Sequence, residues 1–504
     1  YGKAMDIEWA KDGKENKLYI VQARPETVES QKDQNVFYQY RILENKTPIL
    51  TGMAIGKGIV TGTVQIIEKA SQITDFIDGS ILVTEQTDPD WVPIMKKAGG
   101  IITNSGGRTS HAAIVSRELG LPVIVGAKDA TEVLKEEQKI TLSCAGGEQG
   151  EVYDGYIKFQ RQEVNLEKIP KLKTELMLNL ADPDSCFNWW RLPCEGIGLA
   201  RMEFIISNII KVHPMALVDF KKVTSPSIRK EIKELTKNHK NMEDYFVTGL
   251  ARGMAKLAAS QYPKACIVRM SDFKSNEYAG LIGGMYFEKP ESNPMLGFRG
   301  AARYYSEEYR KAFDLECKAV KKAREEIGLD NIIVMIPFCR TLNEADKVLE
   351  IMAANGLSRQ KDGLQIYVMA EIPSNIILAE EFAKRFDGFS IGSNDLTQLT
   401  LGISRDSDQL SEIFDENDAS VKYLIEDLIV KAHKSNTKVG FCGQAPSDKD
   451  TYAQFLVRAG IDSISLNPDS IIRNIEKIAE IEHLIPSEND KKLQKLVDKI
   501  PTPR

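Results

Sequence analysis

Short apolar runs of strand length recur through the C-terminal two thirds of this chain, with helical segments between them. About eight such runs follow one another: LMLNLA, GIGLAR, CIVRM, IIVMIP, IYVMAEIP, GFSIGSND, KVGFCGQ and SISLNP. Strands that alternate with helices predict parallel βαβ units, and about eight such units predict a closed (β/α)8 barrel. An open, doubly wound parallel sheet is the alternative that periodicity leaves open.

The N-terminal third has a different pattern. MDIEWA and KLYIVQAR flank a charged turn and predict a β-hairpin, after which the chain is polar. From Gly52 it is glycine-punctuated and rich in β-forming residues, then helical at HAAIVSRELG, then strand-like at LPVIVG. We therefore expect an α/β protein with five segments: a hairpin at 1–29, a linker at 30–51, a small α/β domain at 52–157, a linker at 158–173 and the barrel at 174–504.

Composition narrows the class of protein. At 504 residues, with 42% hydrophobic and 27% charged residues, the chain is an ordinary globular protein of more than one domain. A net charge of -6 argues against general nucleic-acid binding, so any anion site must be local. Scattered cysteines without a CxxC pair, and no apolar run of about 18 residues, predict a cytoplasmic protein without a membrane partner. The first residue is Tyr1, within a strand-like stretch, which suggests a fragment of a longer protein.

Polar side chains suited to chemistry stand where several of the predicted barrel strands end. The active site of a barrel lies at the carboxyl ends of its strands, so we expect these side chains to converge in one pocket. Any one of them alone would more often be a capping or loop residue, but their shared placement favours a site. They follow strands two, three, five, six and seven: Arg201, Arg269, Glu371, Asn394, Asp395 and Cys442.

These residue types indicate a site for an anion and a divalent cation. Glu371 and Asp395 offer oxygen ligands for Mg2+, with salt bridges to neighbouring arginines as the structural alternative. Cys442 could donate or accept a proton, although a lone cysteine in GFCGQ is more often a small buried apolar residue. Forked, permanently charged donors for phosphate or carboxylate would come from Arg201, Arg269, Arg299 and Arg405.

The densest motif is NSGGRTSHAAIVSRELG, which begins at Asn104. Gly106 and Gly107 allow a tight turn, and His111 stands at the start of the predicted helix, where unpaired N–H groups favour an anion. Neutral imidazole can attack phosphorus and later leave, so His111 is the candidate nucleophile for phosphoryl transfer. A helix-capping or core histidine is the alternative.

Seven motifs together resemble the family of enzymes that interconvert phosphoenolpyruvate and pyruvate through a phosphohistidine: GGRTSHAAIVSRELG, GLARMEF, VRMSDFKSNEY, NPMLGFRG, VMAEIPSN, IGSNDLTQLTLGISRD and GFCGQ. The resemblance spans essentially the whole chain. It implies a swivelling phosphohistidine domain, phosphorylated at His111, followed by a substrate barrel in which Glu371 and Asp395 hold Mg2+ and Cys442 handles the C3 proton. It also implies that substrate phosphate or carboxylate is bound by Arg201, Arg269, Arg299, Asn394 and Arg405.

The first residues resemble the last strands of an ATP-grasp nucleotide-binding domain. By that resemblance, Glu8 would contact metal, and Gln22 and Arg24 would contact ATP phosphates. Enzyme I of the sugar phosphotransferase system has no such domain, and pyruvate phosphate dikinase usually has methionine where Arg108 stands. The synthase branch of the family is therefore favoured, with mainly the pyruvate half reaction in this chain. Pyruvate phosphate dikinase and a phosphohistidine carrier or regulatory module without turnover are the alternatives.

The same resemblance suggests further partners besides pyruvate, phosphoenolpyruvate and ATP. It places Thr109 where a regulatory kinase and phosphorylase act on synthases, and it suggests a homodimer through the barrel.

Overall fold

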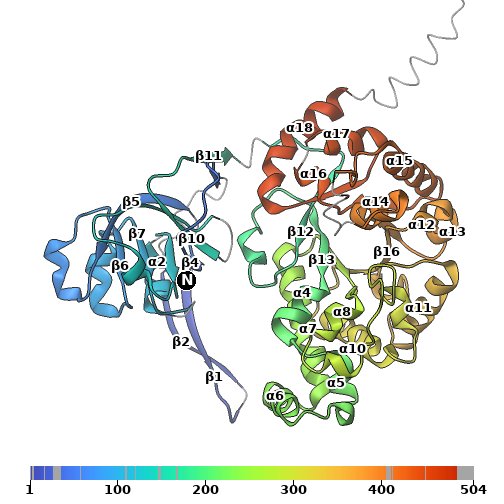
Figure 1. The fold of residues 1–504 in the computed structure, drawn as a ribbon, viewed down its shortest axis with the longest axis horizontal. Coiled ribbons are helices and arrows are strands. Elements are labelled where there is room, and N and C mark those ends of the chain that lie inside the picture. Colours follow the sequence, from blue (N-terminus) through green and yellow to red (C-terminus); the bar gives the residue numbers. More distant parts are fainter. Residues whose placement is uncertain are drawn as a thin grey trace, which may run out of the picture. The chain divides into compact units, whose positions relative to one another are not determined.

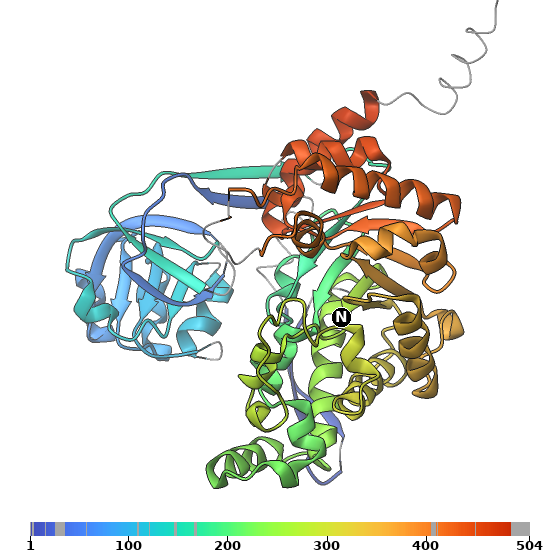
Figure 2. The same cartoon turned by 45° about the vertical axis from the view of Figure 1, so that its right-hand side comes forward.

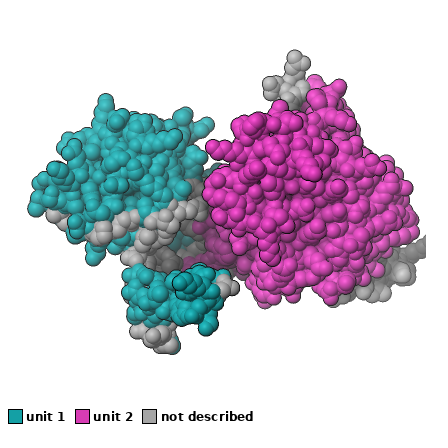
Figure 3. Space-filling model, turned by 90° about the horizontal axis from the view of Figure 1, so that it is seen from below, with its two compact units in different colours: residues 1–168 teal, residues 169–504 magenta. Residues whose placement is uncertain are grey.

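The computed structural model divides the chain into two compact units, residues 1–168 and 169–504, which Figure 3 colours separately. The structure describes residues 2, 5–15, 17–25, 36–56, 58–107, 110–119, 121–145, 149–165, 169–404, 410, 412–448 and 450–484. Each unit is described by itself.

The hairpin predicted at the start of the chain is present. Strands β1 (Met5–Lys11) and β2 (Leu18–Pro25) form a two-stranded antiparallel sheet with a bulge between Glu8 and Trp9. The Asp12 carboxylate accepts the N–H groups of Lys14 and Glu15, each at 2.7 Å, and so closes the turn. This local chemistry explains why a sequence pattern was sufficient to find the hairpin.

A closed seven-stranded barrel forms most of unit 1 (Figure 1). Helices α1 (Val92–Met95), α2 (His111–Leu119) and α3 (Ala130–Val133) connect its strands. In barrel order the strands are β10 (Gln149–Asp154), β4 (Leu50–Ile55), β8 (Val123–Val125), β7 (Gly100–Thr103), β6 (Ile81–Thr84), β5 (Ile59–Ile66) and β9 (Lys139–Ser143).

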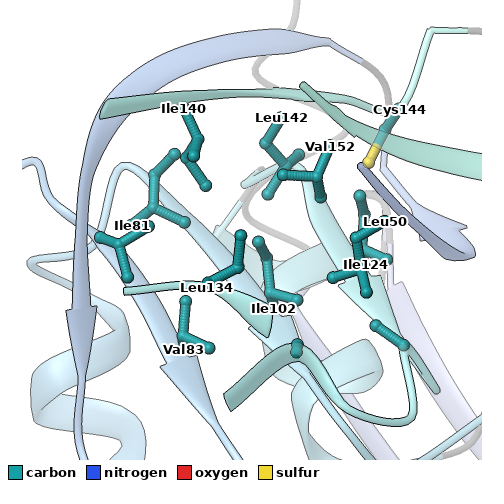
Figure 4. Close-up of a cluster of buried hydrophobic side chains, with 13 residues drawn as sticks. Leu50, Ile81, Val83, Ile102, Ile124, Leu134, Ile140, Leu142, Cys144 and Val152 are labelled. Atoms are coloured by element: carbon teal, nitrogen blue, oxygen red, sulfur yellow. The ribbon is translucent and has the colours of Figure 1, made fainter. Parts of the chain in front are cut away.

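The sequence shows why this sheet closes instead of staying open. In β6, β7 and β8 every residue is buried, so both faces of these strands need a cover. One face lines the barrel interior, where Ile81, Val83, Ile102 and Ile124 pack together (Figure 4). The other face packs against helical residues such as Ala113 in a second core cluster.

The two segments predicted as linkers contain strands of their own. Strand β3 (Val36–Ile42) pairs with β11 (Phe159–Asn165) in an antiparallel two-stranded sheet. The polar composition of these segments hid the strands, because a two-stranded sheet has no fully buried face and therefore needs no apolar run. The domain boundaries given above stay predictions.

Unit 2 is a closed barrel of eight parallel strands, so the predicted (β/α)8 fold is confirmed and the open sheet is wrong. All eight apolar runs form the expected strands, and β19 pairs with β12 to close the ring. In order they are β12 (Glu175–Leu180), β13 (Gly196–Arg201), β14 (Ala265–Arg269), β15 (Ile332–Ile336), β16 (Ile366–Ala370), β17 (Gly388–Ile391), β18 (Lys438–Phe441) and β19 (Ser463–Leu466).

Helices surround these strands (Figures 1 and 2). The longer ones are α6 (Pro226–Thr236), α7 (Met242–Gln261), α10 (Arg310–Lys321), α11 (Leu342–Ala354), α14 (Ser393–Leu401), α15 (Ala419–Lys434), α17 (Asp450–Ala459) and α18 (Ile471–Leu484). Shorter ones are α4 (Met202–Ile205), α5 (Pro214–Val218), α8 (Ser275–Ala279), α9 (Ala301–Tyr304), α12 (Pro373–Ile377), α13 (Ala379–Ala383) and α16 (Ala445–Asp448). Among the described residues, no helix is long and apolar enough to cross a membrane.

Candidate functional site

A cavity of about 430 Å³ opens at the carboxyl ends of the unit 2 strands. Arg201 and Arg269 are the last residues of β13 and β14, and Glu371 and Cys442 directly follow β16 and β18. The first turn of α14, after β17, supplies two more side chains. The structure thus brings together seven of the residues predicted from the sequence: Arg201, Arg269, Arg299, Glu371, Asn394, Asp395 and Cys442.

The Arg299 side chain is clamped between two carboxylates. Its Nε and Nη2 donate to the Asp272 oxygens at 3.1 and 2.5 Å, and its Nη1 donates to Asp395 Oδ1 at 3.1 Å. Arg299 is only 2% exposed. Burial alone would raise the pKa of Asp272, but the Arg299 guanidinium outweighs burial and lowers that pKa. The Asp272 carboxylate is therefore held charged, and its hydrogen bonds and those of Asp395 fix the Arg299 guanidinium in place.

Glu371 differs from these carboxylates because one of its two oxygens accepts no hydrogen bond from the described residues. Its Oε1 accepts the backbone N–H of Phe338 at 2.7 Å, whereas its buried Oε2 has no hydrogen-bond partner among the described residues. Burial raises the Glu371 pKa well above the usual carboxyl value, and the negative charges of Asp395 and Asp272 add to that effect. An unpartnered buried oxygen is costly unless a proton or a cation compensates it.

The pair Glu371 and Asp395 suits a magnesium ion in part. Each Asp395 oxygen accepts one hydrogen bond from Arg299 and keeps a further acceptor position. Among the described residues, no group of three or more His, Cys, Asp or Glu side chains could hold a metal. Mg2+ is commonly bound through only one or two carboxylates together with substrate oxygens, so two carboxylates are sufficient.

Four charged residues of the cavity were not among the predicted site residues: Glu203, Asp272, Lys274 and Glu277. Glu203 Oε1 accepts from Arg269 Nη2 at 2.8 Å and from the Asp272 N–H at 2.6 Å. Lys274 also lines the cavity. Each of Glu203, Asp272 and Lys274 stands two to five residues beyond the end of its strand, in the motifs GLARMEF and VRMSDFKSNEY. These residues could have been predicted from the motifs, but not from a position at the end of a strand.

Comparison with known proteins identifies the family. Residues 158–483 match the model of the phosphoenolpyruvate (PEP)-utilising enzyme, PEP-binding domain. The chain belongs to the PEP-utilising enzymes. Residues 76–147 match the mobile domain of these enzymes, and residues 1–42 match the AMP/ATP-binding domain of pyruvate phosphate dikinase.

Similar curated proteins carry one name. The chain is 52% identical to the phosphoenolpyruvate synthase of a Synechocystis species over 95% of this chain and 59% of that protein. Identity is 50% to the synthase of Aquifex aeolicus, over 95% of this chain and 62% of that protein. Identity to the Escherichia coli synthase is also 50%, over 95% of this chain and 60% of that protein. The chain therefore spans about three fifths of the length of these relatives.

In this PEP-utilising enzyme, Cys442 is almost fully buried and lines the cavity. Its Sγ donates to the Ile391 carbonyl at 3.4 Å, and it packs with Leu199 and Met369 inside the barrel. Burial raises the pKa of the Cys442 thiol. The thiol is therefore protonated in the free protein, as a proton donor would have to be.

The remaining predicted site residues lie in unit 1 or outside the described residues. His111 begins α2, as the glycine-rich motif predicted. In the hairpin, Glu8 faces Gln22 in the strand register, and Arg24 Nε donates to Asp6 at 2.9 Å. Thr109 and Arg405 lie outside the described residues, so their places stay predictions.

Among the described residues, the charges around the cavity nearly cancel, with four cationic and five acidic side chains. The cationic side chains are Arg201, Arg269, Lys274 and Arg299, and the acidic ones are Glu203, Asp272, Glu277, Glu371 and Asp395. Four positive groups against five acidic ones do not by themselves attract a multiply charged anion. A bound divalent cation would make the cavity positive, which is a second reason why its residues suit Mg2+.

Proposed function

We propose that this chain carries the pyruvate half reaction of a phosphoenolpyruvate synthase, in which a phosphoryl group passes between His111 and pyruvate. The observation that carries the proposal is the convergence of Arg201, Arg269, Arg299, Glu371 and Asp395 on one cavity. The name shared by the similar curated proteins supports it.

In this proposal the arginines bind the anionic ends of the substrate. Arg201 and Arg269 end strands at the cavity, and Asn394 adds an amide beside them. Guanidinium groups form forked hydrogen bonds to phosphate or carboxylate and stabilise the charge that spreads in the transition state. Arg299 is already held by Asp272 and Asp395, so it contributes a fixed charge. By family resemblance, Arg405 joins this set.

We further propose that Glu371 and Asp395 hold Mg2+. The unpartnered Oε2 of Glu371 supports this assignment. When bound, Mg2+ supplies positive charge for the oxygen that becomes negative as the enolate forms.

Proton transfer is assigned to Cys442. In the direction of pyruvate formation, the enolate takes a proton at C3 from the thiol. In the reverse direction, the thiolate removes a methyl proton from pyruvate. The enolate oxygen then bonds to phosphorus as the bond between phosphorus and the His111 nitrogen breaks. The raised thiol pKa favours the first direction.

The complete enzyme would convert ATP, pyruvate and water into AMP, phosphoenolpyruvate and phosphate. We propose that Glu8, Gln22 and Arg24 belong to its nucleotide-binding domain, as the match of residues 1–42 supports. A regulatory phosphate on Thr109 would add about -2 charges two residues from His111 and oppose phosphoryl transfer. We also propose a homodimer, from the family resemblance. All seven cysteines are unpaired, which supports a cytoplasmic location.

The test is to mix this chain with Mg2+ and phosphoenolpyruvate labelled in the phosphoryl group. We expect pyruvate release and acid-labile label on the protein, both absent in His111→Ala. His433→Ala is the matched control, because His433 is an exposed histidine that pairs with Asp462 at 3.0 Å. Label that persists in His111→Ala would refute the assignment.

Two further measurements separate the alternatives. A dependence of the full-length protein on inorganic phosphate would indicate pyruvate phosphate dikinase. A carrier or regulatory module would take label from a partner and release no pyruvate from phosphoenolpyruvate.

A further inference from the structure

Strand β15 is the fourth strand of the unit 2 barrel, and its end shows an unusual backbone. Phe338 lies two residues beyond β15 and has a φ of 45°, in the left-handed region. Among the described residues, six other non-glycine residues have a positive φ, and all six are exposed. Phe338 is 2% exposed. A bulky buried residue in this region is a real outlier, and such outliers cluster where a site needs a particular geometry.

The left-handed turn directs one hydrogen bond. The backbone N–H of Phe338 donates to Glu371 Oε1 at 2.7 Å. Because Oε1 is occupied in this way, the Glu371 oxygen without a hydrogen-bond partner in the described part of the chain is Oε2. Glu371 lines the cavity, and a β-carbon added at Gly392, another lining residue, would lie 2.9 Å from Oε2.

The side chain of Asn375 ties the turn to the backbone at Glu371. Asn375 is fully buried, and its amide nitrogen donates to the carbonyl of Cys339 at 2.7 Å. The Asn375 carbonyl oxygen accepts the N–H of Glu371 at 3.3 Å. Asn375 thus links Cys339, the residue after Phe338, to the backbone of Glu371.

The side chain of Phe338 explains why glycine, which adopts a positive φ easily, does not stand here. Its ring lies under the guanidinium of Arg299, 4.1 Å from the ring centre, and under that of Arg340, at 4.7 Å. Arg340 in turn donates to the carbonyl of Gly297 at 2.6 Å, in the loop that carries Arg299. Phe338 therefore contacts both Glu371 and Arg299.

We propose that Phe338 is a positioning residue whose left-handed backbone holds Glu371 Oε1 and leaves Oε2 free for the divalent cation. This inference rests on the proposed function, because it takes Glu371 as a ligand of that cation. Residues that orient a metal ligand in this way change metal affinity by roughly 10- to 100-fold when they are lost.

Three substitutions separate backbone geometry from core filling. Phe338→Gly, Phe338→Ala and Phe338→Val all remove the ring, but glycine adopts a positive φ freely, alanine at a cost, and valine least readily. The probe is Mn2+ alone, with free Mn2+ measured by electron paramagnetic resonance and no substrate present. We expect binding to be tightest in the glycine variant, weaker in the alanine variant and weakest in the valine variant. The two extremes should differ by roughly 10- to 100-fold.

If Phe338 merely fills the core, the reverse order of Mn2+ affinities is expected, because valine replaces most of the lost volume and glycine the least. That order, or equal affinities in the three variants, would overturn the inference while the wild type still binds Mn2+. A wild type that binds no Mn2+ would instead refute the proposed cation site, and the inference with it. If the valine variant does not fold, the glycine and alanine variants decide, with an expected difference of roughly fivefold or more.

Phe382 is the matched control position. It is also a fully buried phenylalanine, but it lies in α13, has no positive φ and does not line the cavity. The same three substitutions at Phe382 should lower thermal stability and leave the Mn2+ affinity unchanged.

Discussion

Glu316 should make the stability of unit 2 fall as the pH rises from about 4.5 to about 7. It is fully buried in α10 and accepts hydrogen bonds from Ser271 Oγ at 2.5 Å and from the Tyr309 hydroxyl at 2.9 Å. Burial raises its pKa from 4.5 to about 7, although those hydrogen bonds oppose the shift. The folded protein therefore keeps a proton that the unfolded chain releases.

The size of the effect follows from the shift. Each pKa unit corresponds to about 1.4 kcal/mol, so the shift from 4.5 to about 7 corresponds to about 3 kcal/mol. Below pH 4.5 the carboxyl is protonated in both states, and its contribution to stability is complete. As the pH rises toward 7, the unfolded chain loses the proton first and stability falls. Above about pH 7 the loss is complete.

Glu316→Gln should remove this pH dependence, because the amide resembles the protonated acid. The amide nitrogen can donate to the hydroxyls of Ser271 and Tyr309, which can rotate. We expect the variant to gain up to about 3 kcal/mol on the wild type between pH 5 and pH 8.5. For a unit of this size, with an unfolding entropy of about 2.1 cal/mol/K per residue, that is a relative gain of about 4 °C in Tm.

Differential scanning calorimetry at pH 5, 7 and 8.5 measures the difference directly. Glu326→Gln is the control, because Glu326 is an exposed carboxylate that pairs only with Lys322 among the described residues. A Tm difference between Glu316→Gln and the wild type that stays constant from pH 5 to pH 8.5 would refute the reasoning.

Three other predictions concern the cavity. Cys442→Ser should still take a phosphoryl group from phosphoenolpyruvate, yet slow the exchange of pyruvate methyl protons with deuterium by roughly 10²- to 10⁴-fold; normal exchange by NMR would remove Cys442 from the mechanism. Gly392→Ala would place a methyl group 2.9 Å from Glu371 Oε2 and should weaken Mn2+ binding, measured by titration, by roughly 10-fold or more. Asp272→Asn leaves Arg299 with one carboxylate, so calorimetry should show a loss of about 3 kcal/mol and the KM for phosphoenolpyruvate should rise; an unchanged Tm would contradict the ion-pair account.

Local patterns in the sequence identified the strands of the unit 2 barrel, the side chains at their ends, and the hairpin of unit 1. The barrel runs are recognisable because strands buried on both faces need continuous apolar residues. Arg201, Arg269 and Cys442 could be placed at the cavity because a residue at the end of a barrel strand has a fixed place in the fold. The start of α2 at His111 followed from the glycines before it.

Other features could not be read from local patterns. Strands β3 and β11 lie more than a hundred residues apart, and only their pairing makes them strands. The clamp of Arg299 between Asp272 and Asp395 joins two separate loops and the first turn of α14. The choice between Mg2+ ligand and salt-bridge partner therefore could not be made for Asp395 from the sequence.

Phe338 shows the limit most clearly. Nothing in IIVMIPFCR marks its phenylalanine as left-handed, and glycine or asparagine would be the local expectation for that conformation. The conformation depends on contacts with Glu371 and Arg299, which come from other parts of the chain. The sequence by itself determined which segments form the strands of the unit 2 barrel and which side chains stand at their ends, because those properties depend on neighbouring residues. Only the tertiary structure decided which oxygen of Glu371 is free, because that depends on the meeting of separate loops.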